Sequence, residues 1–127
     1  EQRESFFQRS QIVYGAIAEH EQLLTTKFLD FIGSRKDIRL IGGHNQDKDI
    51  RVPTFSFVSN KMGSEEIARA VAQDEVAISS GHFYAKRLVE SLQIKDTEDG
   101  VVRCSMAHYN TIEEVDKLIH SLDRVLG

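Results

Sequence analysis

Apolar residues near the end of the chain recur with the spacing of an amphipathic helix. From residue 112 onward they occur three and four positions apart, at Ile112, Val115, Leu118, Ile119, Leu122, Val125 and Leu126. Thr111 and Glu114 have the spacing of a capping box, in which each side chain binds the backbone amide of the other residue. The pattern therefore predicts a helix that begins directly after Thr111.

Residues 101–106, just before this turn and helix, predict a strand with two different faces, because side chains alternate along a strand. The apolar face is formed by Val102, Cys104 and Met106. Arg103 and Ser105 share the other face. Because a buried, unpaired guanidinium is costly, Arg103 needs a partner. Two alternatives are an ion pair with Glu98 or Asp99 and a two-pronged contact with the carboxylate or phosphate of a ligand.

The beginning of the chain predicts a long helix over residues 3–33. It contains no proline, and its apolar residues follow roughly one stripe: Phe6, Val13, Ile17, Leu24, Phe28, Phe31 and Ile32. Gly33 stands where a helix-terminating glycine is expected. Such a helix is on the order of 45 Å long, more than a domain of this size covers by itself. Either the run forms two helices, or its N-terminal half packs on something outside this domain, which is the interpretation we favour.

The middle of the chain predicts shorter elements. Strands are expected at residues 38–41, 51–58 and 76–78, helices at 64–72 and 85–92, and a loop at 79–84. Ser64 is the expected N-cap of its helix. The order of helices and strands predicts an α+β fold over a single domain, residues 1–127. In residues 34–127 we expect a small, mostly antiparallel sheet with helices on one face, preceded by the long helix.

Composition narrows the function only slightly. With 127 residues and a net charge of −4, the chain gives no reason to expect nucleic-acid or membrane-surface binding, and no apolar run could span a bilayer. A single cysteine fits a cytoplasmic location. Because the chain begins with Glu1, we expect a fragment or a processed product.

Few residues suggest chemistry of their own. The five histidines are scattered without metal-ligand spacing, so no metal site is predicted, although His44 and His82 both lie in expected loops. Cys104 lies on the apolar face of its strand, where a free cysteine usually acts as a small hydrophobic residue. Arg103 is therefore the strongest candidate for a binding residue.

Three stretches resemble the C-terminal small domain of class V aminotransferases, with cysteine desulfurase-like proteins as the nearest group. They are RVPTFSF at 51–57, SGHFYA at 80–85 and GVVRCSMAHYNTIEEVDKL at 100–118. The resemblance covers residues 38–126, and the long first helix resembles the one that links the family's large and small domains. It implies part of an enzyme of fold-type I that depends on pyridoxal phosphate, acts on an amino acid and is commonly a homodimer.

The resemblance also implies roles for residues. Arg103 would bind the α-carboxylate of the substrate, and His82 and Tyr84 would lie near it. Tyr84 stands where desulfurases carry the cysteine that accepts sulfur, so the parent could be a desulfurase-like lyase or transferase, or an epimerase. The family's large domain, which holds the cofactor and the lysine that bonds to it, is not in this chain. This chain alone is therefore not expected to catalyse, and none of its residues is assigned as catalytic. The alternative is a free-standing module that binds or senses an amino acid.

Overall fold

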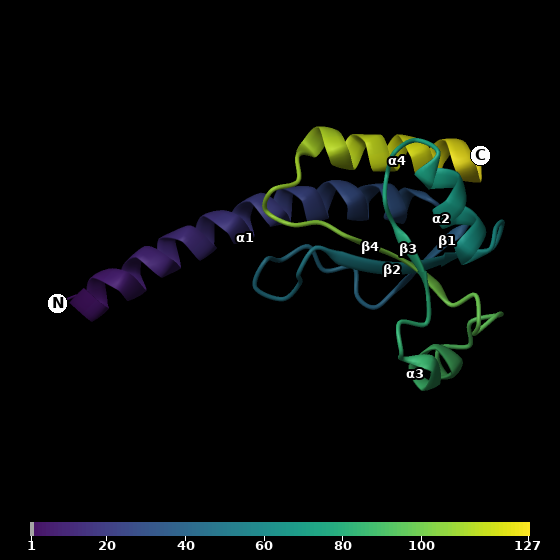
Figure 1. Cartoon of the computed structure of the whole chain (residues 1–127), viewed down its shortest axis with the longest axis horizontal. Helices are drawn as coiled ribbons and strands as arrows, with labels where there is room; N and C mark the ends of the chain where they lie inside the picture. Colours follow the sequence, from purple (N-terminus) through teal and green to yellow (C-terminus); the bar gives the residue numbers. More distant parts are fainter. Residues whose placement is uncertain (1) are drawn as a thin grey trace.

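A four-stranded antiparallel sheet forms the centre of the computed structural model, which describes the backbone of residues 2–127 and the side chains from residue 5 onward. The strands, in their order across the sheet, are β1 (Ile38–Ile41), β2 (Thr54–Ser59), β4 (Val101–Ser105) and β3 (Ser79–Gly81). The helices are α1 (Gln2–Ser34), α2 (Ser64–Ala72), α3 (Lys86–Ser91) and α4 (Ile112–Leu126). α1, α2 and α4 cover one face of the sheet, whereas the short α3 lies apart from this layer (Figure 1). The predicted α+β fold is confirmed.

The core lies between the sheet and these three helices. Phe28 of α1 packs against Phe55 and Phe57 of β2, with ring centroids 4.9 and 6.4 Å apart, and all three side chains are fully buried. Because side chains alternate along a strand, burial of Phe55 and Phe57 turns Thr54 and Ser56 to the opposite face. That opposite face is not covered by α1, α2 or α4, and we call it the open face of the sheet (Figure 1).

Helix α1 is a single helix of 33 residues, so the interpretation as two helices is wrong. Its C-terminal half packs in the core, and its N-terminal half extends beyond the sheet (Figure 1). The expected stop at Gly33 is also wrong, because the helix continues to Ser34. There the Ser34 hydroxyl and the Arg35 amide donate hydrogen bonds to carbonyls of the last turn, at 2.7 and 3.2 Å, and so end the helix.

Helix α4 begins as the sequence predicts. The Thr111 hydroxyl accepts a hydrogen bond from the Glu114 amide at 3.2 Å, and the Glu114 carboxylate accepts one from the Thr111 amide at 2.9 Å. The Asn110 carbonyl also lies 2.7 Å from Nε2 of His20 on α1. This contact joins the turn after β4 to the long helix.

Helix α2 is capped by a distant residue, and the prediction of Ser64 as its N-cap is wrong. Ser64 is the first residue of the helix, and its hydroxyl donates to the Gly100 carbonyl at 3.1 Å. The carboxylate of Asp99 accepts hydrogen bonds from the amides of Ser64 and Glu65, at 2.5 and 2.9 Å. The loop before β4 thus satisfies the free amides of α2 and fixes where β4 begins.

The third strand differs from the prediction. A strand was expected at residues 76–78 and a loop at 79–84, but β3 consists of Ser79–Gly81 and pairs with Val101–Arg103 of β4. Val76 and Ile78 are partly buried and pack against the core without belonging to a strand. Gly100, with φ +67°, approaches Gly81 so closely that a side chain there would overlap the Gly81 carbonyl. The strand order places β3 at the edge of the sheet, and this close approach holds its end against the start of β4.

Candidate functional site

Arg103 lies on the open face of the sheet, in β4, between β2 and β3. The register places Ser56 of β2 and Ser79 of β3 directly opposite it. Two residues further along β4, the hydroxyl of Ser105 accepts a hydrogen bond from Thr54 at 3.1 Å. The guanidinium is therefore the positive group on a face that otherwise presents small hydroxyl side chains at this point. The sequence placed Arg103 and Ser105 on one face correctly, but it did not reveal their neighbours.

Within the described part of the chain, Arg103 forms no ion pair or hydrogen bond through its side chain. The two carboxylates expected as alternatives have other partners: Glu98 pairs with Lys86, and Asp99 caps α2. The hydrogen bond from Lys86 holds the pKa of Glu98 below its ordinary value, and nearby His82 adds to this effect. Neither acid neutralises Arg103, so its N–H groups are free to bind an anion.

The contact that Arg103 does make is with an aromatic ring. Its guanidinium carbon lies over the ring of Phe83, 3.9 Å from the centroid. A cation over the face of an aromatic ring is attracted by the negative potential of that face. Sequence reasoning missed Phe83, and the only signal was its place between His82 and Tyr84 in the motif.

The turn that carries Phe83 has an unusual backbone. Phe83 and Tyr84 have φ angles of 50° and 62°, in the left-handed region, and the Ala85 amide donates to the His82 carbonyl at 2.8 Å. Two consecutive positive φ angles within a closed four-residue turn are typical of type I′, which prefers Asn and Gly. Two aromatic residues in these positions are strained.

The other two predicted site residues lie on the same turn. Tyr84 is fully exposed and projects into solvent. Nδ1 of His82 is buried and has no hydrogen-bond partner among the described residues. The turn therefore brings His82 and Tyr84 next to Phe83, whose ring contacts Arg103.

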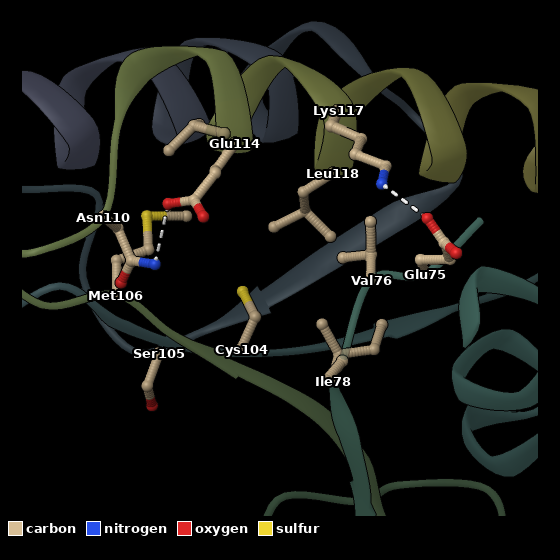
Figure 2. A pocket seen from close by; sticks show the side chains of 12 residues that line it. Glu75, Val76, Ile78, Cys104, Ser105, Met106, Asn110, Glu114, Lys117 and Leu118 are labelled. Carbon is tan, nitrogen blue, oxygen red and sulfur yellow. Dashed lines mark hydrogen bonds and ion pairs between the residues drawn. The ribbon is translucent and has the colours of Figure 1, made fainter.

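Cys104 lies on the opposite face of β4, as its place in the strand predicts. It is 3 % exposed, and burial raises the pKa of its thiol to about 12, so it stays protonated and unreactive. It borders a cavity of about 290 Å³ between β4 and α4, together with Ile78, Met106 and Leu118 (Figure 2). At its rim the Lys117 ammonium pairs with the Glu75 carboxylate at 3.7 Å. Polar and apolar side chains both line this cavity, and the Cys104 thiol is held protonated by burial.

The residues that the structure covers contain neither a metal-binding cluster nor a membrane-spanning helix. Among the side chains of residues 5–127, no three from His, Cys, Asp or Glu are grouped so that they could bind a metal ion. Over residues 2–127, none of the helices has both the length and the apolar character needed to cross a membrane.

Comparison with known proteins identifies a match over most of the chain. Residues 6–118 match the family model described as Aminotransferase class-V. The aminotransferase-like protein FGM3 of Gibberella zeae is 46 % identical over 114 residues, which cover 89 % of this chain and 28 % of FGM3. The cysteine desulfurase-like protein ustD of Aspergillus flavus is 31 % identical over 112 residues, which cover 87 % of this chain and 26 % of ustD. The chain thus spans about a quarter of the length of these curated relatives.

Solved structures share the fold. The apo cysteine desulfurase from Thermococcus onnurineus NA1 superposes with a TM-score of 0.74 at 24 % identity, over 92 % of this chain and 28 % of that one. The cysteine desulfurase CsdA from Escherichia coli superposes with a TM-score of 0.70 at 23 % identity, over 85 % of this chain and 25 % of that one. At these identities the similarity concerns the fold.

Proposed function

We propose that this chain, which belongs to the class V aminotransferase family, is the small C-terminal, substrate-closing domain of a pyridoxal phosphate-dependent enzyme that acts on an amino acid. Its relatives include a protein described as a cysteine desulfurase-like protein and one described as aminotransferase-like. Since the chain spans about a quarter of their length, catalysis would belong to the whole enzyme.

The observation that carries this proposal is the state of Arg103. Its guanidinium is exposed on the open face and is not neutralised by a carboxylate of the described chain. By the resemblance of residues 100–118, it would correspond to the family's carboxylate-binding arginine. A guanidinium binds a carboxylate through two parallel N–H···O bonds, which fix orientation as well as position. Arg103 would thus hold the α-carboxylate of an amino acid and orient the rest of the substrate.

The cofactor would be held by the rest of the enzyme. Pyridoxal phosphate acts as an electron sink for bonds at the α-carbon of an amino acid and needs a lysine to bond to it. None of the seven lysines here is buried, and Lys27 and Lys86 are engaged in ion pairs with Asp116 and Glu98. Residues of this chain would therefore not form the cofactor site by themselves. They fit the carboxylate end of the substrate instead.

The exposed half of α1 supports the role as a domain. Its large apolar side chains, which are 56 to 75 % exposed, are Phe6, Phe7, Ile12, Val13 and Tyr14. Large exposed apolar side chains gathered on one segment of a helix are typical of an interaction site. We propose that it packs on the large domain of the same enzyme. By the family resemblance the enzyme would be a homodimer, and the single cysteine of this chain fits a cytoplasmic location.

The closing domain would also bring His82 and Tyr84 toward the substrate, since both lie on the turn beside Arg103. Tyr84 has no thiol, so a persulfide cannot form at this position. We therefore favour a reaction other than desulfuration through this residue. Closure of the domain would exclude water from the site, which strengthens the contact between a guanidinium and a carboxylate.

Replacement of Arg103 tests this function in the full-length enzyme. We expect Arg103→Ala to lower kcat/KM for L-amino acids by an amount that corresponds to about 2 kcal/mol of transition-state stabilisation, the scale of a lost hydrogen bond to a charged group. The kcat/KM of Arg103→Lys should lie between those of the wild type and Arg103→Ala. Arg69→Ala is the control, because Arg69 lies on α2 and pairs with Glu65 on the surface. If kcat/KM stays at the wild-type value across a panel of L-amino acids, Arg103 does not bind the carboxylate and the proposal fails.

A further inference from the structure

We infer that Phe83 is the positioning residue for Arg103, and that its ring holds the guanidinium so that the N–H edge meets the α-carboxylate of an amino acid. This inference rests on the proposed function of Arg103 and assigns a second residue to the same site. It follows from the contact itself, from the backbone of the turn and from the direction in which Arg103 extends.

The contact with Phe83 is the closest of three between an arginine and an aromatic ring in the described residues. The guanidinium carbon lies 3.9 Å from the ring centroid of Phe83, whereas Arg35 lies 5.9 Å from Phe31 and Arg51 lies 5.0 Å from Phe55. Arg35 and Arg51 also donate hydrogen bonds to oxygen atoms of the chain, which fix their side chains independently of the ring. Arg103 has no such hydrogen bond in the described structure, so the ring of Phe83 is what holds its guanidinium in place.

The form of this contact leaves the hydrogen-bonding groups available. The five N–H donors of a guanidinium lie in its plane and point outward from its edge. A ring over the face covers none of them, whereas an ion pair with an acid would use two. Phe83 therefore restricts the motion of Arg103 without competing with the carboxylate of a substrate. This lowers the entropy that is lost when the substrate binds.

The backbone of the turn shows that Phe83 is held in place. Phe83 and Tyr84 both have positive φ angles, a conformation that persists in bulky residues only when the surroundings impose it. On one side the turn follows β3, which pairs with β4 and approaches Gly100 closely. On the other side Lys86, the first residue of α3, pairs with Glu98 in the loop before β4. The turn is thus fixed at both ends to β4 and the loop before it.

The register shows which way Arg103 extends. Ser79 pairs with Arg103 and Gly81 pairs with Val101, so the turn after Gly81 lies beyond the start of β4. To reach Phe83, the Arg103 side chain extends over Val101 and away from Ser105. Consistent with this, Val101 is only 5 % exposed although it lies on the open face. Apart from the ring of Phe83, the described structure has no hydrogen bond or ion pair that would direct Arg103 this way.

The test compares L-alanine, which has an α-carboxylate, with L-alaninamide, which does not, as probes of the full-length enzyme loaded with cofactor. Apparent affinity is measured from the change in cofactor absorbance on titration. We expect Phe83→Leu to weaken L-alanine binding about fivefold, the scale of one cation–π contact, and to leave L-alaninamide unchanged. Phe83→Tyr, which keeps the ring, should retain wild-type affinity. Phe31→Leu removes the contact with Arg35 and should have no effect.

A second arm shows whether Phe83 acts through Arg103. In an Arg103→Lys background, Phe83→Leu should cause no further loss of L-alanine affinity, because the planar group that the ring positions is absent. Thermal unfolding confirms that each variant is folded, and Phe83→Met replaces Phe83→Leu if the latter does not fold.

The outcomes separate this inference from the proposed function. If Arg103→Lys weakens L-alanine binding and Phe83→Leu does not, Phe83 has no positioning role, while the function of Arg103 stands. An equal loss for L-alanine and L-alaninamide would also overturn the inference, because it would mean that the ring supports the turn rather than Arg103. If neither variant changes binding of L-alanine, the proposed function fails and the inference fails with it.

Discussion

At the scale of single residues, Arg35 and Asp37 form the most completely paired charges of the structure. The guanidinium donates to both carboxylate oxygens of Asp37, at 3.0 and 2.7 Å, and also to Asp123 of α4 at 2.5 Å. Only 11 % of the Arg35 side chain and 13 % of the Asp37 side chain are exposed. The hydrogen bond from Arg35 is the main reason that the pKa of Asp37 lies below its ordinary value of 3.8. The contact of Arg35 with Asp123 joins the end of α1 to the last turn of α4.

The pair predicts a dependence of stability on pH. A carboxyl group whose pKa is lower in the folded state stabilises the fold above its unfolded pKa, and this stabilisation is lost as the pH falls through the folded pKa. We expect Asp37→Asn to be less stable than the wild type at pH 7 and the difference to shrink below pH 3.8. Urea unfolding of both proteins at pH 7 and at pH 3 measures it. A difference that does not change with pH would contradict the prediction.

For Arg103, the sequence predicts the face of the sheet on which it lies but not its contact with Phe83. Alternation along β4 placed Arg103 on the face opposite Cys104, because this depends only on neighbouring residues. Phe83 and Arg103 are 20 positions apart, and their contact depends on the register of β3 against β4 and on the unusual turn after β3. Neither the register nor the turn can be read from a local pattern. Phe83 was therefore missed, although its neighbours His82 and Tyr84 were predicted as site residues.

At the scale of the elements, the cap of α2 deserves a direct test. Asp99 accepts hydrogen bonds from two amides that otherwise have no partner within the helix. We expect Asp99→Ala to lower the free energy of unfolding by about 1 kcal/mol, as for other lost N-caps. Asp99→Asn, which keeps one acceptor oxygen, should lose less. Chemical denaturation measures both, and equal stability of Asp99→Ala and the wild type would show that this cap adds nothing.

Prediction of the elements succeeded where the signal is local. α4 has a complete apolar stripe and a capping box, and both are contained in consecutive residues. The cap of α2 was misassigned to Ser64 because its true partner, Asp99, lies 35 residues later. β3 was misplaced because an edge strand of three residues has too little alternation to be recognised, whereas the apolar Val76–Ile78 next to it resembles a buried strand.

At the scale of the whole molecule, α1 has one half in the core and one half in solvent. Replacement of Phe6 and Phe7 by serine should change the stability of the 127-residue chain by less than about 0.5 kcal/mol, because both side chains are exposed. Phe28→Ala is the matched control and should cost about 3–5 kcal/mol, since Phe28 is fully buried. Thermal or urea unfolding distinguishes these cases.

The same double variant tests the proposed packing of α1 when it is made in the full-length enzyme. There we expect a clear loss of stability, because Phe6 and Phe7 would be buried against the large domain. If the full-length enzyme is as stable with serine at both positions, this half of α1 does not pack on the large domain. A loss in the 127-residue chain as large as that of Phe28→Ala would instead mean that the helix is packed within this chain.

The strand order has a consequence for how the protein is made. β3 precedes β4 in the chain, yet its only partner in the sheet is β4. During synthesis, β1 and β2 can pair once residue 59 has left the ribosome. β3, and the edge of β2 that faces away from β1, have no partner until residues 101–105 have been made. A nascent chain that stalls before this point exposes an unpaired strand edge, which favours aggregation and clearance. Arg103 therefore reaches its place in the sheet only when β4, the last of these four strands along the chain, has paired with β2 and β3.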